Sequence, residues 1–230
     1  MTRDSTHFEM DNDEQIDRSL ALSEIISVVI SCLIAEWVIT AVVGESHPLI
    51  AVPIVLAFAL MFLSHRLRGE SLRDLGFRLD NFGQAVGLLI VPMVTVSAIL
   101  LVIGYFRGSL DFFRWRGGQS ILGMPLLGIL WGLLQQYALQ GFINRRAQIV
   151  WGPGVVGILV VALLFGAFHL PNPALTLATF AGGLLWATVY QRAPNLFALA
   201  LSHGLMTWIL ISTLPGGLLH GLRVGYKFIG

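Results

Sequence analysis

The sequence has few charged residues for its length: Asp, Glu, Lys and Arg make up 12% of its 230 residues, whereas 56% are hydrophobic. A soluble domain usually carries about 25% charged residues, so this chain has too little polar surface for a soluble fold of its size. Its mean hydropathy of +0.78 agrees with this. We therefore predict an all-α protein, a polytopic membrane bundle of about seven transmembrane helices.

Cysteine is almost absent as well. The single residue Cys32 excludes a disulfide framework and a cysteine-based metal cluster. The formal net charge of +1 at pH 7 gives no argument for a nucleic-acid partner. We expect neither a cofactor nor a metal, because a catalytic zinc usually has three protein ligands. The apolar segments offer only His169 and His203 for this role, unless Glu36 joins them.

Acidic residues are missing from the second half of the chain. Asp111 is the last carboxylate side chain, so segment 112–230 cannot use one for acid–base or metal chemistry. Within the predicted helices the only carboxylates are Glu24 and Glu36. Glu24 lies near a helix end, where its side chain can reach the membrane surface. Glu36 lies deeper, and both a hydrogen-bonded structural role and a place in a polar site remain open for it.

Long apolar segments divide the chain into three parts. Residues 1–19 are polar and acidic, which predicts a solvated, disordered tail. Residues 20–214 form the predicted membrane domain, and the glycine-rich residues 215–230 form a loose C-terminal tail. A bilayer core about 30 Å thick needs about 20 mostly apolar residues in a helix. The segments that meet this length approximately are 20–43, 48–67, 85–106, 121–144, 154–171, 175–191 and 195–214.

The distribution of positive residues indicates the orientation in the membrane. With the N-terminus inside, nine of the 14 Arg and Lys residues lie in inner segments. The other five lie outside: Arg107, Arg114, Arg116, Arg223 and Lys227. Because cytoplasmic loops are enriched in Arg and Lys, we predict a cytoplasmic N-terminus. We expect an integral protein of the cytoplasmic (inner) membrane of a prokaryote.

Segment 121–144 carries the densest set of polar side chains at membrane depth. Gln136, Gln140, Asn144 and Gln148 follow one another at four-residue intervals, so on a helix they form one slowly winding stripe. Gln135 broadens this stripe. Such a pattern is typical of a hydrogen-bond ladder between helices. It equally fits a functional site, because polar groups in a membrane are costly and often functional.

Two histidines fall at a similar depth on other predicted helices. His169 follows Phe165 by four residues, and Thr207 follows His203 by four, so each pair shares one helix face. A single membrane histidine is usually a packing residue, but two histidines together with a glutamine cluster favour a site. The residues that we expect to line one cavity are Gln135, Gln136, Gln140, His169 and His203.

Three short motifs follow one another in this part of the chain. They are Gln135-Gln136-Tyr137-Ala138-Leu139-Gln140-Gly141-Phe142, Phe165-Gly166-Ala167-Phe168-His169 and His203-Gly204-Leu205-Met206-Thr207. Their order and spacing resemble the CAAX prenyl endopeptidase and bacteriocin-processing family of intramembrane proteases, which includes lysostaphin-resistance protein A-like proteins. That family has Glu-Glu, three residues, Arg, Gly, Phe; then Phe-x-x-x-His; then His-x-x-x-Asn or Asp. The family-like core covers about residues 121–214.

The sequence departs from this family pattern at the residues that carry the chemistry. Gln135 and Gln136 stand at the two glutamates, Gln140 at the arginine, and Thr207 at the Asn or Asp. In the family, the first glutamate is thought to activate the water that attacks the peptide bond. The histidines and the Asn shape the oxyanion site. A glutamine can position a water but cannot deprotonate it, and the three glutamines together would form a neutral site without a buried charge.

The resemblance implies an intramembrane endopeptidase that cleaves a lipidated or membrane-embedded peptide, with membrane lipid and a peptide or membrane-protein substrate as partners. One histidine would act as general base and the other would donate to the oxyanion, while Gln135 orients the water. The site residues implied are His169, His203, Gln135, Gln136, Gln140 and Thr207. A second hypothesis is an inactive family member that binds a transmembrane or lipidated partner. A transporter or channel is less favoured, because no internal repeat is evident.

Overall fold

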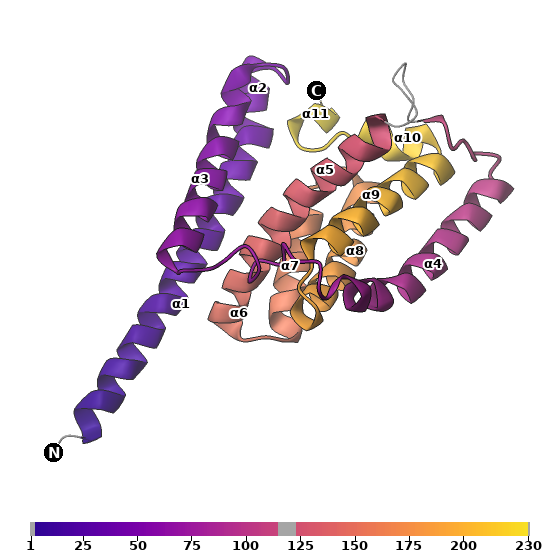
Figure 1. Cartoon of the computed structure of the whole chain (residues 1–230). Coiled ribbons are helices and arrows are strands. Elements are labelled where there is room, and N and C mark those ends of the chain that lie inside the picture. Colours follow the sequence, from indigo (N-terminus) through magenta and orange to yellow (C-terminus); the bar gives the residue numbers. More distant parts are fainter. Residues whose placement is uncertain (1–2, 115–122, 230) are drawn as a thin grey trace.

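The computed structural model describes residues 3–114 and 123–229, and these fold mainly into helices (Figure 1). Six helices are long and apolar enough to cross a membrane, and the apolar helix α7 (Val155–Ala167) is shorter. The predicted all-α membrane bundle is therefore confirmed, but the fifth predicted span is shorter than a full crossing. Arg116 and the predicted start of the fourth span at residues 121–122 lie outside the described residues.

Two of the spans contain π-helical segments. The six spans are built on α1 (Arg3–Leu33) with its continuation to Val43, α3 (Ala51–Leu67) with the turn before it, α4 (Phe82–Phe106), α5 (Gly123–Gln136) with its continuation to Trp151, α8 (Pro173–Arg192) and α9 (Leu196–Thr213). The π-helix η1 (Ile34–Ile39) leads from α1 into α2 (Thr40–Val43), and the π-helix η4 (Tyr137–Asn144) leads from α5 into α6 (Arg145–Trp151). Short π segments inside helices often occur at functional sites. Here they contain the polar residues Glu36 and Gln140.

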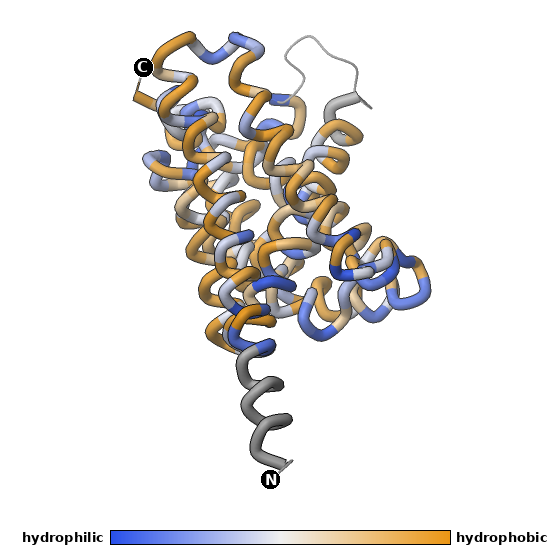
Figure 2. The backbone as a smooth tube through the Cα atoms, turned by 90° about the vertical axis from the view of Figure 1, so that its left-hand side faces the viewer, coloured by the Kyte–Doolittle hydropathy of each residue, from blue (hydrophilic) through white to orange (hydrophobic). Residues whose placement is uncertain are grey.

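The helices form two groups (Figure 1). Helices α1 and α3 pair as a hairpin, and α6 packs against α1 and so connects the hairpin to the rest. In the second group α5 packs along α9, α7 packs along α8, and α4 lies against the outer side of α9. Hydrophobic residues cover most of the helices, and hydrophilic residues gather at the loops (Figure 2). Such an apolar exterior suits contact with lipid.

Glycines let the helices of the second group approach closely. A Cβ added at Gly183 of α8 would lie 2.8 Å from Cα of Ala162 on α7. A Cβ at Gly132 of α5 would lie 3.1 Å from the backbone oxygen of Ala200 on α9. Small residues at such crossings allow membrane helices to pack backbone against backbone. This packing brings the helices that carry the three motifs around one buried polar centre.

Both predicted tails differ from expectation. The segment expected to be a disordered tail continues the first membrane helix, because α1 begins at Arg3. A helix that already exists adds residues without the cost of nucleation, and Arg18 pairs with Glu14 one turn earlier. At the other end, α10 (Gly216–Leu219), η5 (His220–Leu222) and α11 (Tyr226–Ile229) fold back onto the bundle. The buried side chain of Asn172 holds them by donating to the carbonyls of Leu219 and Arg223.

Helix α7 ends before its predicted boundary at residue 171. It stops at Ala167, and a turn leads to α8, which begins at Pro173. Pro171 and Pro173 lack the backbone N–H that a continuing helix needs. Asn172 caps the new helix, since its side-chain oxygen accepts a hydrogen bond from the backbone N–H of Leu175. His169 lies in this turn, at the end of α7.

Candidate functional site

The first and third motifs meet between α5 and α9. Gln136, the last residue of α5, is fully buried, and its Nε2 lies 3.1 Å from Nδ1 of His203 on α9. Gly132 makes this approach possible, because a Cβ there would lie 3.3 Å from the Cβ of His203. An amide nitrogen can only donate, so Nδ1 of His203 accepts this bond. The hydrogen-bond network thus assigns the imidazole proton to Nε2.

Aromatic rings hold both histidines. The imidazole of His203 stacks on the ring of Trp186 from α8, with the centroids 4.7 Å and the planes 7° apart. Phe165 of α7 presents its ring to both histidines, with centroid distances of 5.9 Å to His203 and 5.0 Å to His169. Trp186 is fixed in turn, because its Nε1 donates to Oγ of Ser202 at 2.9 Å. The second motif therefore joins the other two through Phe165.

His169 is held as the other neutral tautomer. This half-buried side chain places Nδ1 2.7 Å from the backbone carbonyl oxygen of Phe165. A carbonyl oxygen can only accept, so Nδ1 of His169 carries the proton and Nε2 keeps a free lone pair. Beside one phenyl ring, His169 thus offers a proton acceptor and His203 an N–H donor.

Gln140 belongs to a separate set of hydrogen bonds. Its fully buried side chain accepts a 2.7 Å hydrogen bond from Nδ2 of Asn144 through Oε1. Oδ1 of Asn144 accepts from Nε2 of Gln148 at 3.3 Å and from Nε2 of Gln191 on α8 at 2.9 Å. These contacts confirm a ladder from Gln140 to Gln148 that bonds to a second helix. Gln136 leaves the ladder and bonds α9 instead.

The remaining predicted site residues are less closely joined. Gln135 and Thr207 are half-buried, and none of the hydrogen bonds found within the described residues links them to either histidine. Glu36 lies in η1 and packs against the C-terminal segment, because a Cβ added at Gly225 would lie 3.1 Å from the Cβ of Glu36. The described residues contain no group of three His, Cys, Asp or Glu that could hold a metal ion. The structure thus joins Gln136, His203 and, through Phe165, His169.

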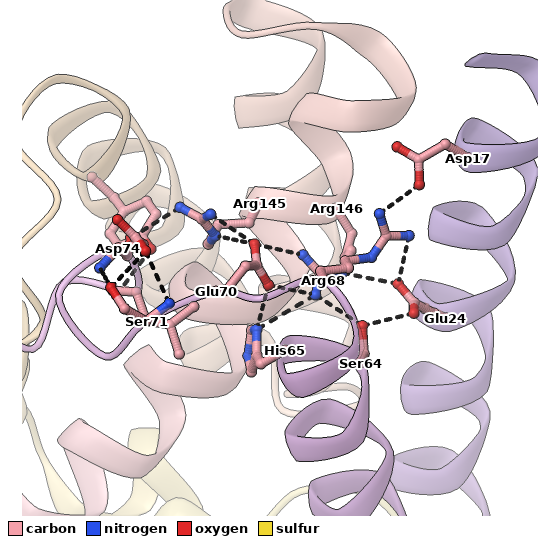
Figure 3. A network of polar contacts seen from close by, with 12 residues as sticks. Asp17, Glu24, Ser64, His65, Arg68, Glu70, Ser71, Asp74, Arg145 and Arg146 are labelled. Carbon is pink, nitrogen blue, oxygen red and sulfur yellow. Dashed lines mark hydrogen bonds and ion pairs between the residues drawn. The ribbon is translucent and has the colours of Figure 1, made fainter. Parts of the chain in front are cut away.

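A second polar cluster, drawn in Figure 3, is not predicted from the sequence. Arg146 of α6 is fully buried, and its Nε lies 2.9 Å from Oε2 of Glu24 on α1. Its Nη2 lies 2.8 Å from Oε2 of Glu70, which follows α3. Nδ1 of His65 and Nη2 of Arg145 also reach this carboxylate, at 2.6 Å and 2.7 Å. The only signal in the sequence is that these residues stand at or just beyond the ends of apolar segments.

This cluster controls the ionisation of Glu70, which lies outside the membrane-spanning helices. Burial alone would raise its pKa, but hydrogen bonds from His65, Arg146 and Arg145 outweigh burial and hold the pKa of Glu70 well below its usual range. The carboxylate is therefore ionised and stays paired. As a result, α6, which directly follows the first motif, is tied to the loop after α3.

Glu24 is also placed differently from the expectation that it reaches the membrane surface. Its Oε1 accepts a 2.7 Å hydrogen bond from Oγ of Ser64, and its Oε2 pairs with Arg146. The side chain is only 12% exposed. Glu24 therefore links α1 to α3 and α6 inside the bundle, where its charge is neutralised by a buried guanidinium.

The segment that holds the three motifs is similar to a known family. Residues 117–209 match the family model described as type II CAAX prenyl endopeptidase Rce1-like. No curated protein and no solved structure matches the chain. The long apolar helices and this match together identify an integral membrane protein. The resemblance to the CAAX prenyl endopeptidases that the three motifs predict is thereby confirmed for the part of the chain that carries them.

Proposed function

We propose that the protein is an intramembrane endopeptidase that hydrolyses a lipidated or membrane-embedded peptide, with His169 as general base and His203 as oxyanion donor. The observation that carries the proposal is that the two histidines beside Phe165 are different neutral tautomers. His169 carries its proton on Nδ1, and His203 carries its proton on Nε2. A general base needs a free lone pair, which Nε2 of His169 has. An oxyanion donor needs an N–H, which Nε2 of His203 has.

In the proposed reaction, a water attacks the carbonyl carbon of the peptide bond. Nε2 of His169 takes a proton from this water as the new C–O bond forms. The carbonyl oxygen becomes negative and accepts a hydrogen bond from Nε2–H of His203. The C–N bond then breaks, and the protonated His169 returns the proton to the leaving amine. Gln136 and Trp186 support this step because they hold the His203 ring through Nδ1 and by stacking.

The glutamines of the first motif fit a histidine-based reaction. Segment 112–230 has no carboxylate side chain, so a base in the motif helices must come from another residue type. Gln135 is half-buried next to Gln136 and is proposed to orient the attacking water. Thr207, one helical turn after His203, is proposed to complete the oxyanion side. The distribution of Arg and Lys supports a cytoplasmic N-terminus, and the membrane is proposed to be the cytoplasmic membrane of a prokaryote.

The test is cleavage of prenylated and transmembrane peptides by purified protein in liposomes, with and without a chelator. His169→Gln and His203→Gln should each lower kcat by about 10²-fold or more, since each removes a group that acts in the transition state. His47→Gln changes an exposed histidine in the loop before α3 and should leave kcat unchanged. Full activity in His169→Gln would contradict the assigned base.

A binding protein with the same site is the second candidate, and the two glutamines at the glutamate positions favour it. The discriminating variant combines Gln135→Glu, Gln136→Glu and Gln140→Arg, which supplies both the acids and a counter-ion. Cleavage by this variant but not by the wild type would favour the binding role. A histidine-dependent wild-type activity would favour the peptidase.

A further inference from the structure

The turn between α7 and α8, residues 168–172, carries His169 and is not helical. Because the apolar helix α7 is shorter than a full crossing, this turn lies within the apolar depth of the bundle. The backbone N–H of Asn172 donates to the carbonyl oxygen of His169 at 3.0 Å and closes the turn. Non-helical backbone at membrane depth must be covered by protein or line a cavity, so the other polar groups of the turn need partners from elsewhere in the chain.

The C-terminal segment supplies such a partner through Gly225. We call residues 216–229 the C-terminal strap. The backbone N–H of Gly225 donates to the carbonyl oxygen of Leu170 at 2.8 Å. On its other side Gly225 lies against the hairpin, because an added Cβ would be 3.0 Å from the backbone oxygen of Glu36 in η1. The strap thus contacts both groups of helices, and it meets the second group at the residue after His169.

Asn172 holds the strap from the side of the turn. Its fully buried side chain donates to the carbonyl oxygens of Leu219 and Arg223, at 3.0 Å and 3.1 Å. Residues 220–222, which lie between these two positions, all have a left-handed backbone, with φ of 46°, 63° and 60°. Two of the three are not glycine, so this conformation is strained and persists only where surrounding contacts hold it. The two bonds from Asn172 are such contacts.

Two successive carbonyls of the turn are therefore anchored. That of His169 accepts from Asn172, and that of the next residue accepts from the strap. The imidazole of His169 reaches back one turn to the carbonyl of Phe165, and this bond depends on the place of the His169 backbone. If the strap is released, the carbonyl of Leu170 loses its partner at membrane depth, and the turn must rearrange to satisfy it.

We propose that the C-terminal strap belongs to the candidate site and that Asn172 is a positioning residue for His169. The backbone of Asn172 holds the carbonyl of His169, and its side chain holds the strap, which fixes the next carbonyl. Asn172 thereby keeps Nδ1–H of His169 on its acceptor, so that Nε2 keeps its free lone pair. The effect on cleavage rests on the proposed function, whereas the placement of His169 does not.

Asn172→Ser removes the bonds to the strap but keeps the helix cap. Serine is a good N-cap residue, but its short side chain has one hydroxyl and no amino group that could reach two carbonyls. The first readout is hydrogen exchange of the strap in liposomes, followed by mass spectrometry. Exchange should become faster by about 10-fold or more, because two hydrogen bonds are lost.

The second readout is the tautomer of His169, measured from nitrogen NMR shifts of protein with isotope-labelled histidine in liposomes at alkaline pH. The signal is assigned by its loss in His169→Gln. We expect Nδ1–H alone in the wild type and a mixture with Nε2–H in Asn172→Ser, because an imidazole that is released from its acceptor can adopt either neutral form. In the same variant kcat for peptide cleavage should fall by about 10-fold or more.

Asn195→Ser is the matched control. Asn195 is also fully buried and caps a helix, α9, and its amino group also donates to two oxygens, those of the Arg78 carbonyl and the Asn81 side chain. These contacts lie at the other end of α8, so their loss should leave the exchange of the strap and the tautomer of His169 unchanged. Equal changes in both variants would show a general loosening of the bundle and overturn the role of Asn172.

Gly225→Ala tests the strap from its other side, also in the event that Asn172→Ser does not fold. Alanine rarely adopts a φ of 57°, and its Cβ would press on the backbone of Glu36. We expect the same faster exchange and the same mixed signal of His169. Faster exchange of the strap with an unchanged His169 tautomer, in either folded variant, overturns the proposal. Unchanged exchange of the strap in Asn172→Ser does so as well.

The positioning role and the proposed function can fail separately. A changed His169 tautomer in the folded variants, without peptide cleavage by the wild type, would keep the positioning role and reject the proposed function. Cleavage by the wild type, with an unchanged His169 tautomer in the folded variants, would do the reverse.

Discussion

Arg146 has the largest side chain among those that the structure buries completely. Its guanidinium pairs with Glu24 from one side and with Glu70 from another. A buried charge is tolerated when it is neutralised and hydrogen-bonded, and removing its partner leaves an uncompensated charge. This one residue therefore joins α6 to the α1–α3 hairpin, directly after the helix that carries the first motif.

Arg146→Met should lower the free energy of unfolding by about 3–5 kcal/mol, because Glu24 and Glu70, whose side chains are only 12% and 11% exposed, lose the buried cation that they share. Reversible unfolding in detergent measures this loss. Arg66→Met is the matched control, since Arg66 is exposed on α3, and its effect should stay within about 0.5 kcal/mol. Equal stability of the two variants would mean that the cluster contributes little.

The lowered pKa of Glu70 makes stability depend on pH. A carboxyl group with a usual pKa of 4.5 binds a proton more readily in the unfolded state than in the folded state, where its pKa is lower. The stabilisation is therefore complete above about pH 4.5 and is lost as the pH falls further. Glu70→Gln should flatten this acid-side decrease in Tm, whereas Glu45→Gln, in an exposed loop, should not.

The sequence predicts that Gln136, Gln140 and His203 lie at a buried site, but not which partners they have. Gln136 and His203 stand out by residue type and depth, yet their contact depends on the close approach of α5 and α9 at Gly132. For Glu70 the only signal is its place just beyond an apolar segment, because its partners come from α3 and α6. Such pairings are decided by packing between distant segments.

At the scale of elements, the π-helix η4 explains why the predicted stripe divides. On a regular helix, positions four apart continue along one face. The wider turn of a π-helix changes this phase, and here Gln136 bonds α9 while the ladder that begins at Gln140 bonds α8. The four-residue spacing of the polar side chains predicts the polar face, but not the local change from an α-helix to a π-helix.

The crossing of α7 and α8 depends on the absence of a side chain at Gly183. Gly183→Ala should cost about 1–3 kcal/mol, because its Cβ would lie 2.8 Å from Cα of Ala162 and the two backbones must separate. The same shift should weaken peptide cleavage, since Phe165 and Trp186 contact each other across this crossing. Unfolding and activity of the variant in detergent measure both effects.

The control for this prediction is Gly87→Ala in α4, where an added Cβ meets no atom within 4 Å. Alanine is a better helix former than glycine, so this variant should be as stable as the wild type or slightly more stable. A loss of stability of the same size in both variants would argue against a specific role for the α7–α8 crossing.

At the scale of the whole molecule, the loop between α3 and α4 lies at the opposite end of the bundle from the loop after α4 (Figure 1). With Cys32→Ser as background, an impermeant thiol reagent should label Leu72→Cys from the cytoplasmic side only. It should label Arg107→Cys from the other side only. Both positions are exposed. Labelling of both from one side would contradict the proposed topology.

Hydropathy predicts most of this architecture because a membrane helix must satisfy its own backbone hydrogen bonds over the whole apolar depth. It does not predict the ends of the chain, where α1 extends to Arg3 and Asn172 binds the C-terminal segment. It also overestimates α7, whose end is set by Pro171 and Pro173. Length and polarity thus reveal the spans, while caps and distant hydrogen bonds decide where they stop.

The short helix α7 also affects the surrounding lipid. Its 13 residues rise only about 20 Å, roughly 10 Å less than the hydrocarbon core of a typical bilayer. Its exposed side chains, among them Val156 and Leu163, meet the acyl chains over that shorter height. A bilayer thins beside such a helix to relieve the hydrophobic mismatch. We expect thinning here to draw headgroups and water toward His169 at the end of α7, so that the hydration of the site depends on the thickness of the host membrane.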